Sequence, residues 1–276
     1  MRKSAVVFIT LALFVFGTAA ASAGVPEMAD QLMNAFVNKE PTPLVTVTNA
    51  KLDLKTAYDV QKAYVQQRLA GDSPAGFKAG FTNKAVQKKF GVAAPAAGVL
   101  YAKGLYTGEP VIAAAGSGLV IEVEIGFVVG EEITEPVKDV AELKEKVSGV
   151  MPAIELPSMR FANMKLLKGL DVIAADVGAD GAIAGKEVKA GDVDLNALVV
   201  TLYRDGKFVH MGRGADALGD QWATALWLVN TMVKQGYEIK PGQILITGAL
   251  GQVVPAAAGH YEAYWGPLGK IAFDIL

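Results

Sequence analysis

Two glutamates one residue apart occupy a segment that otherwise has the composition of a buried strand. Glu122 and Glu124 lie in residues 119–129, whose other members are apolar residues or glycine. Because side chains alternate between the two faces of a strand, both carboxylates point the same way, about 7 Å apart. Like charges at this separation repel each other and resist removal from water. A bound cation would relieve both costs; the alternative is that the pair forms the wet face of an edge strand.

A third glutamate strengthens the first interpretation. Glu155 stands in the apolar stretch 150–156, and a lone carboxylate among apolar neighbours requires a partner. A set of carboxylates with neither His nor Cys favours a hard cation, Mg²⁺ or Mn²⁺, over Zn²⁺. We therefore predict that Glu122, Glu124 and Glu155 are metal ligands.

Several segments resemble one enzyme family, in the same order along the chain. The segment GFKAGFTNKAVQ (76–87) is similar to the glycine-lysine-glycine segment of the 2-keto-4-pentenoate hydratases. The segment IEVEIGFV (121–128) is similar to their Glu-x-Glu metal strand, and PAIE (152–155) to the segment of their third ligand. Shorter matches occur at 175–176, 214–219, 247–250 and 268–269. The resemblance extends to the 2-oxohepta-3-ene-1,7-dioate hydratases, within the fumarylacetoacetate hydrolase superfamily.

This resemblance implies a fold, a reaction and a set of site residues. The fold would be α+β: a mixed, mostly antiparallel β-roll with a small helical N-terminal part. The reaction would be hydration of a small 2-oxo or 2-hydroxydienoic acid by a lyase that uses Mg²⁺ or Mn²⁺ to stabilise an enolate. The protein would be a homo-oligomer. The three glutamates would hold the metal, Lys78 would be catalytic, and the substrate would contact Phe81, Asp176, Thr247 and Gly248.

Three departures from the hydratase pattern keep other functions open. The hydratases carry an acidic residue where this chain has Ala96, an Asn at the place of Val177, and a hydroxyl residue at the place of Gly251. One alternative is an oxo-diacid decarboxylase of the same superfamily, which needs the same metal. A second is a non-catalytic exported binding protein that keeps the fold. A third, a structural β-protein without a metal, predicts that the three glutamates are scattered in space.

The periodicity of the chain supplies the elements that must position these residues. Strands dominate the C-terminal two-thirds without regular alternation with helices, which favours an α+β fold around a curled, mostly antiparallel sheet. We expect a helical N-terminal subdomain at 24–95 and a β-roll domain at 96–276. The expected helices are 26–38, 53–69, 83–90, 139–147 and 220–235. The expected strands are 76–82, 119–129, 149–156, 170–177, 198–204, 207–211, 243–247, 260–265 and 270–275, with short strands in the loop 95–118.

Composition excludes several other functions. Of the 276 residues, 26 are Lys or Arg and 28 are Asp or Glu, so the chain lacks the basic excess of a nucleic-acid binder. It has no Cys and no Gly-x-Ser-x-Gly motif, which excludes thiol chemistry and gives no support to an acyl-transfer triad. His210 and His260 are interpreted as surface or hairpin histidines.

The first residues have the layout of a secretory signal peptide. A basic start (Arg2, Lys3) precedes an apolar run at 5–16, and Ala21-Ser22-Ala23 supplies a small-residue cleavage pattern. We predict cleavage after Ala23, a periplasmic or secreted protein, and no membrane association after removal of residues 1–23. An uncleaved N-terminal anchor is the alternative, although the run is short for a bilayer span.

Overall fold

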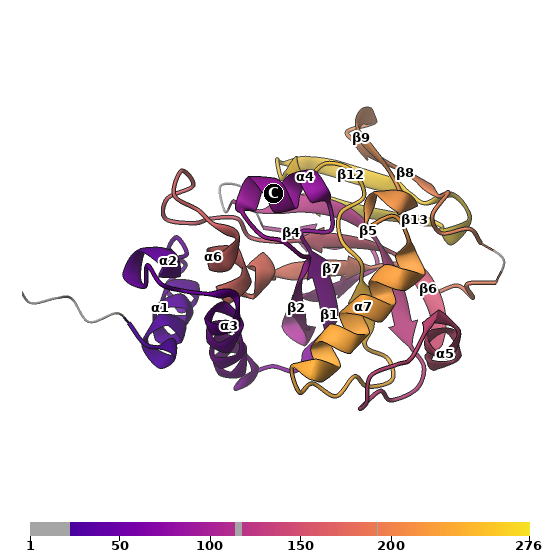
Figure 1. Ribbon diagram of the computed structural model, residues 1–276. Helices are drawn as coiled ribbons and strands as arrows, with labels where there is room; N and C mark the ends of the chain where they lie inside the picture. The colour runs from indigo at the N-terminus through magenta and orange to yellow at the C-terminus, as the bar shows by residue number, and fades with distance from the viewer. Residues whose placement is uncertain (1–22, 114–117, 192) are drawn as a thin grey trace, which may run out of the picture.

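The computed structural model describes residues 23–113, 118–191 and 193–276. Indigo helices at one side adjoin a strand-rich body (Figure 1). The α-helices in the described ranges are α1 (Val25–Val37), α2 (Val45–Thr48), α3 (Leu54–Leu69), α4 (Lys84–Phe90), α5 (Val140–Lys146), α6 (Gly169–Ala174) and α7 (Gln221–Lys234). Short 3₁₀ helices are η1 (Ala102–Gly104), η2 (Asp176–Gly178), η3 (Gly214–Asp216) and η4 (Gly266–Leu268).

The strands form two sheets, which are mostly antiparallel. The larger sheet has the order β2-β1-β10-β5-β6-β7-β3, with β11 added beside β5, and the smaller has the order β4-β13-β12-β8-β9. Three pairs are parallel: β1 with β10, β3 with β7, and β4 with β13. The strands are β1 (Pro74–Gly80), β2 (Ala96–Tyr101), β3 (Leu105–Thr107), β4 (Val111–Ile112), β5 (Val120–Val129), β6 (Val147–Leu156), β7 (Gly181–Ala184), β8 (Val199–Arg204), β9 (Lys207–Arg213), β10 (Ile244–Ile246), β11 (Val254–Pro255), β12 (Gly259–Tyr264) and β13 (Lys270–Ile275).

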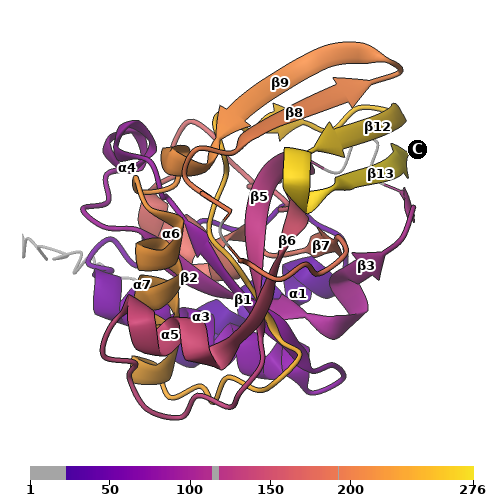
Figure 2. The ribbon, with the colours of Figure 1, turned by 90° about the vertical axis from the view of Figure 1, so that its right-hand side faces the viewer.

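The larger sheet curls so that its two ends approach each other. Strands β2 and β3 stand at opposite ends of the order, yet only the turn η1 separates them along the chain. Figure 2 shows β8, β9, β12 and β13 as a layer above the curled β5 and β6. The predicted α+β fold with curled, mostly antiparallel sheets is thus confirmed.

Three buried clusters of apolar side chains hold these parts together. The main core joins the two sheets and α7 through residues such as Ile125, Phe127 and Trp265. A second cluster packs α1 and α3 against α6, through residues such as Leu32 and Ile173. A small third cluster fills the inner face of the larger sheet with side chains that include Ala153 and Ala182. Small side chains such as these therefore pack on the sheet face that also carries the carboxylates of β5 and β6.

The start and end signals of the predicted helices have the expected chemistry. The side chains of Asp53, Asn83, Asp139 and Asp220 each accept a hydrogen bond from a backbone N–H in the first turn of α3, α4, α5 and α7. Gly91 ends α4 with a φ of 68°, which glycine adopts without the penalty of a Cβ. The hairpin at Asp205-Gly206 is also present between β8 and β9.

One predicted element is wrong. Residues 170–177 were expected to form a strand, but they form α6 and the turn η2. A short apolar run is compatible with either state, and here Asp171 decides. Its carboxylate accepts hydrogen bonds from Lys168 N at 3.0 Å and Thr46 N at 2.8 Å, which fixes the first turn of a helix. The short strand β7 was not predicted.

The predicted division at residue 95 stays a prediction. Strand β1 precedes that boundary, and it pairs with β2 and β10 beyond it. The predicted signal peptide lies outside the described residues, apart from Ala23. Across the described ranges, every helix is too short or too polar to cross a bilayer.

Candidate metal centre

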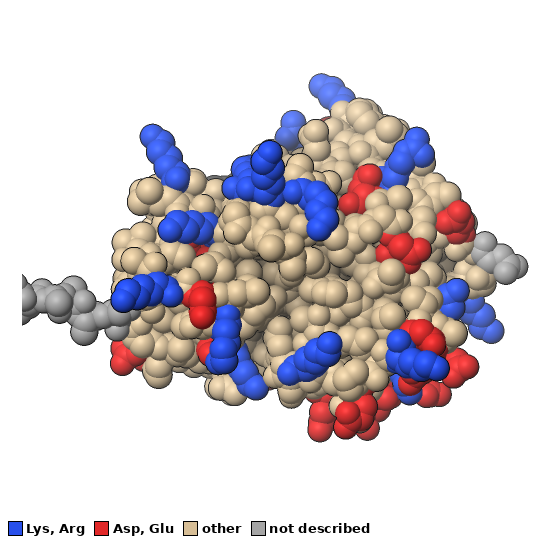
Figure 3. All heavy atoms as spheres, in the orientation of Figure 1, with Lys and Arg blue, Asp and Glu red and all other residues tan. Residues whose placement is uncertain are grey.

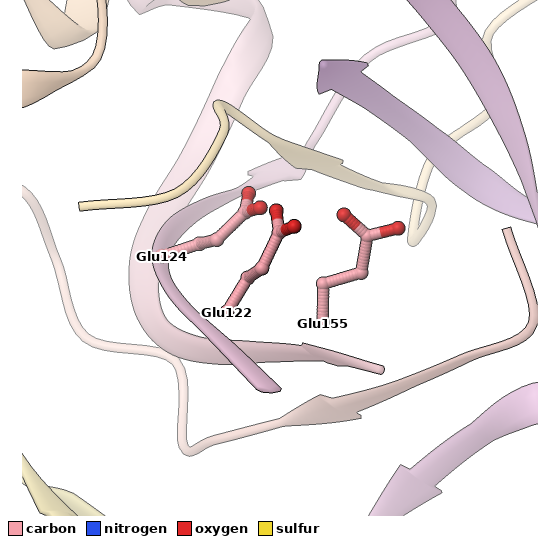
Figure 4. Close-up of side chains that lie close together, drawn as sticks. All are labelled: Glu122, Glu124 and Glu155. Carbon is pink, nitrogen blue, oxygen red and sulfur yellow. The ribbon is translucent and has the colours of Figure 1, made fainter. Parts of the chain in front are cut away.

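Three carboxylates converge on the inner face of the larger sheet. Glu122 and Glu124 project from β5 in the same direction, and Glu155 projects beside them from β6 (Figure 4). One carboxylate oxygen from each glutamate lies within 4.8 Å of the others. The three glutamates are therefore not scattered in space, as a purely structural β-protein would predict.

The carboxylates are largely removed from water. Glu124 and Glu155 are fully buried and Glu122 is partly buried. Glu124 Oε1 and Glu155 Oε2 are buried without a hydrogen-bond partner among the described residues. Burial and the charge of Glu155 raise the pKa of Glu122 to about 7. Burial and the other two glutamates raise the pKa of Glu124 well above its ordinary value. Without a cation, this cluster therefore favours protonated carboxyls.

A buried lysine faces the cluster. Lys78, in the middle of β1, is 2% exposed, and its Nζ lies 2.5 Å from Glu155 Oε1 and 3.0 Å from the carbonyl oxygen of Val177. Burial disfavours the charged ammonium, but Glu155 and Glu122 outweigh that effect and raise the pKa of Lys78. Three ionised carboxylates and one ammonium leave the cluster with two uncompensated negative charges. A divalent cation matches that deficit and the oxygen-only donor set.

Backbone and indole groups fix the position of Glu124. Gly248 N donates to Glu124 Oε2 at 2.7 Å, and Trp265 Nε1 donates to the carbonyl oxygen of Glu124 at 2.7 Å. Gly248 has a φ of 101°, and Thr82 packs so closely against its Cα that a Cβ would collide with it. Gly248 was predicted as a substrate-binding residue, whereas Trp265 was not predicted, because no local pattern connects it to β5.

The predicted substrate-binding residues lie in different surroundings. Thr247 is buried, and its hydroxyl lies 2.5 Å from Gln221 Oε1 and 3.1 Å from the carbonyl oxygen of Ile125. Asp176 is also buried, and both of its oxygens accept hydrogen bonds from β2. Phe81 is partly buried and contacts the ring of Phe90 at 5.3 Å. The side chains of Thr247 and Asp176 are therefore engaged within the protein.

The two histidines stand outside the carboxylate cluster. His260 is half-exposed and lies 2.8 Å from Asp274 Oδ1, as expected of a surface histidine. His210 lies in the hairpin strand β9, which agrees with the interpretation as a surface or hairpin histidine, and it is buried there, with Nε2 2.8 Å from the carbonyl oxygen of Leu250. Gly251 provides the room, since a Cβ there would lie 2.5 Å from His210 Cε1.

Comparison with known proteins assigns the chain to a family. The fumarylacetoacetate (FAA) hydrolase C-terminal family matches residues 78–271, which include all three glutamates and Lys78. The chain belongs to this family. The resemblance predicted from the sequence is thus confirmed for the family and its superfamily.

The relatives of this chain are named for different reactions. A 2-keto-4-pentenoate hydratase from Burkholderia vietnamiensis (strain G4 / LMG 22486) is 33% identical over 223 residues, covering 79% of this chain and 85% of the relative. A 4-oxalocrotonate decarboxylase from Pseudomonas sp. (strain CF600) is 27% identical over 238 residues, covering 84% of this chain and 89% of the relative. The solved 4-oxalocrotonate decarboxylase from Pseudomonas putida G7, complexed with magnesium and adipate, has a TM-score of 0.83 at 26% identity. The match covers 91% of this chain and 97% of the chain in that structure.

Proposed function

We propose that the protein is a divalent-metal-dependent lyase that hydrates a small 2-oxo or 2-hydroxydienoic acid. The observation that carries this proposal is the convergence of Glu122, Glu124 and Glu155 beside Lys78. When all three carboxylates are ionised, the single ammonium leaves two negative charges for a divalent cation to balance. The named hydratases among its relatives support the reaction, and the solved relative with magnesium supports the ion class. Mg²⁺ is our first choice and Mn²⁺ the second.

The three glutamates would hold the cation through the oxygens that now converge. Glu124 Oε1 and Glu155 Oε2, which are buried without hydrogen-bond partners in the described part of the chain, are natural ligand atoms. A bound divalent cation would supply a Lewis acid for the oxygens of a 2-oxo acid. Gly248 N and Trp265 Nε1 keep Glu124 in place, so the ligand does not have to reorganise when the cation binds.

Lys78 is the candidate for handling charge and protons at the substrate. Its ammonium carries three protons, and two are directed at Glu155 Oε1 and the carbonyl oxygen of Val177. The third proton of Nζ would be the one to reach a substrate oxygen. An ammonium in a site with little water stabilises negative charge that develops when a proton leaves the carbon next to a carbonyl.

Surface charge fits an anionic substrate. Figure 3 shows Lys and Arg side chains along the upper edge, over the position of α4 in Figure 1, and acidic side chains at the lower right, near α5. The basic residues of α4 are Lys84, Lys88 and Lys89, and the helix begins two residues after Thr82, which contacts Gly248. A positive surface on α4 would raise the local concentration of a carboxylate substrate around the protein.

Decarboxylation of an oxo-diacid is the second candidate function. It is favoured by the solved decarboxylase, which matches nearly the whole chain, and by Ala96 at the place of an acid in the hydratases. The comparisons offer no support for a non-catalytic binding protein, because these relatives are named as enzymes. Export after cleavage at Ala23 and a homo-oligomeric state are further proposals, which rest on the sequence interpretation.

A turnover assay tests the proposal. Purified protein is mixed with 2-hydroxypenta-2,4-dienoate, and loss of ultraviolet absorbance is followed with Mg²⁺, with Mn²⁺ and with a chelator. Parallel samples receive 4-oxalocrotonate, and release of carbon dioxide is measured. Metal-dependent consumption of the dienoate supports the hydratase. Carbon dioxide release without hydration favours the second candidate. Absence of both reactions, together with no Mg²⁺ binding by calorimetry, would overturn the proposal.

A further inference from the structure

The turn that follows α6 has an unusual backbone. Asp176 has a φ of 55° and Val177 a φ of 54°, so two successive residues other than glycine occupy the left-handed region. This conformation is a true outlier for a β-branched residue such as valine. Such a conformation persists only where the surroundings impose it, and strained backbone of this kind concentrates at functional sites.

Strand β2 imposes the conformation of this turn. Asp176 Oδ1 accepts a hydrogen bond from Val99 N at 2.9 Å, and Asp176 Oδ2 accepts one from the hydroxyl of Tyr101 at 2.7 Å. Both bonds are buried, and Asp176 is not exposed to solvent. A second connection lies nearby, since Gln61 Nε2 donates to the carbonyl oxygens of Ala97 and Ile173. The turn is therefore fixed to a rigid frame of β2, α3 and α6.

Two neighbouring strands lack side chains where the turn packs. A Cβ on Gly98 of β2 would lie 2.9 Å from both the carbonyl oxygen and Oδ1 of Asp176. A Cβ on Gly80 of β1 would collide with Cγ1 of Val177. The open side of Gly80 is therefore filled by the side chain of Val177.

These contacts fix the position of the carbonyl group of Val177. Because the turn is left-handed, the carbonyl oxygen of Val177 accepts a hydrogen bond from Lys78 Nζ at 3.0 Å, while Glu155 holds the same ammonium from another side. We propose that Asp176 and Tyr101 are positioning residues: they hold the Val177 carbonyl on Lys78 and thereby fix the ammonium among the carboxylates. The inference rests on the proposed function insofar as Lys78 acts on the substrate.

The first test measures the reactivity of Lys78 itself, without any turnover. Tyr101→Phe removes the hydroxyl that donates to Asp176, and Tyr58→Phe is the matched control. The Tyr58 hydroxyl also bonds to β2, accepting from Ala97 N at 3.2 Å, but it does not touch the turn. Acetylation by acetic anhydride is followed for each lysine by peptide mass spectrometry. We expect acetylation of Lys78 to become about five-fold faster in Tyr101→Phe, because one hydrogen bond less favours local opening.

The internal controls decide between local and global effects. Lys84, Lys88 and Lys89 should react at parental rates in both variants, and Tyr58→Phe should leave Lys78 at its parental rate. Parental reactivity of Lys78 in folded Tyr101→Phe would overturn the proposal. An equal increase in Tyr58→Phe at equal loss of stability would overturn it as well. Asp176→Asn, which keeps the shape of the side chain, provides the same measurement if Tyr101→Phe does not fold.

A second test uses turnover of 2-hydroxypenta-2,4-dienoate with Mg²⁺. In Tyr101→Phe and Asp176→Asn we expect kcat to fall about five-fold with little change in KM, since binding of the cation and substrate is retained while Lys78 is misplaced. Tyr58→Phe should keep the parental kcat. If the parent shows no turnover, the proposed function fails while the acetylation result still decides the positioning role. An unchanged kcat in both variants would overturn that role.

Discussion

Glu122 and Glu155 stand directly opposite each other across the antiparallel pair of β5 and β6. Like charges in directly opposed positions destabilise a sheet, and here both residues are also withdrawn from water. Glu124 stands opposite Ala153, whose side chain is only a methyl group. The pairing register therefore brings the carboxylates together, and their proximity lowers the stability of the metal-free protein.

Replacing Glu124 by Gln removes one charge and keeps the size of the side chain. We expect Mg²⁺ affinity to fall about ten-fold or more, because one anionic ligand is lost. The metal-free variant should unfold at a higher temperature than the metal-free parent. The folded parent must either keep a proton on Glu124 that the unfolded chain releases or bear the repulsion of a third charge, and Gln avoids both costs. Calorimetric titration and thermal unfolding measure the two effects. Glu145→Gln, at an exposed position of α5, is the control. An unchanged Mg²⁺ titration for Glu124→Gln would sink the metal assignment.

The stability of the metal-free protein should depend on pH through Glu122. Its pKa is about 7 in the folded protein and 4.5 in an exposed chain, so between these values the folded state keeps a proton that the unfolded state releases. The contribution of Glu122 to the unfolding free energy should therefore fall by about 3 kcal/mol as pH rises from 4.5 to 7, and then level off.

Glu122→Gln isolates this contribution. The variant lacks the titration, so in urea unfolding with a chelator its advantage over the parent should grow from pH 4.5 to pH 7 and stay constant above. Saturating Mg²⁺ should stabilise the parent more than the variant at pH 7.5, because binding to the folded state adds to stability. A variant–parent difference that shrinks as pH rises would contradict the proposed burial of a neutral carboxyl.

Gly80 and Val177 should be energetically coupled. Gly80→Ala places a methyl group against Cγ1 of Val177 and should cost about 2 kcal/mol of unfolding free energy. Val177→Ala removes the group that is in the way, so the double variant should be more stable than the sum of the single effects by about 1 kcal/mol. Urea unfolding measures the four proteins. Gly71→Ala, with no atom closer than 3.9 Å to the new Cβ, should have little effect. Additive single effects would show that the contact carries no strain.

Ala96→Asp tests whether a missing acid limits hydration. Ala96 is buried at the start of β2, opposite Gly80, so the new carboxyl would lie in a site of low solvent access. We expect faster hydration of a 2-hydroxydienoate and a loss of roughly 2 kcal/mol in stability, because a polar group is buried. Ala96→Asn provides the shape without the acid and should not gain activity. A substantial hydratase rate in the parent would show that Ala96 was never the obstacle.

The sequence predicted the parts of the site that depend on local periodicity. Alternation along β5 placed Glu122 and Glu124 on one face, and the apolar surroundings of Glu155 marked it as a residue that needs a partner. The resemblance contributed Lys78, whose closely following Lys84, Lys88 and Lys89 would otherwise suggest a surface position. These predictions needed the strand period and the order of motifs, not the packing of the whole chain.

The remaining parts of the site depend on tertiary packing. The left-handed turn at Asp176 and Val177 could not be predicted from the sequence, because a β-branched valine is among the residues least expected in that conformation. Trp265 reaches the backbone of Glu124 from the smaller sheet, across a long separation in the chain. The helix α6 was mistaken for a strand because its first turn is fixed by a hydrogen bond from Thr46, which no local window includes.

The parallel pairing of β1 with β10 also determines when the site can form during synthesis. Lys78 pairs with Ile246, so the strand that carries the lysine has no neighbour on that side until nearly the whole chain has left the ribosome. The β5–β6 pair is much more local, and it can bring Glu122 opposite Glu155 far earlier. The β5–β6 pair can therefore bring the carboxylates together before β10, which lies between β1 and β5 in the sheet, is available. A chain released before residue 244 would carry all three carboxylates without the strand that seats Lys78 among them.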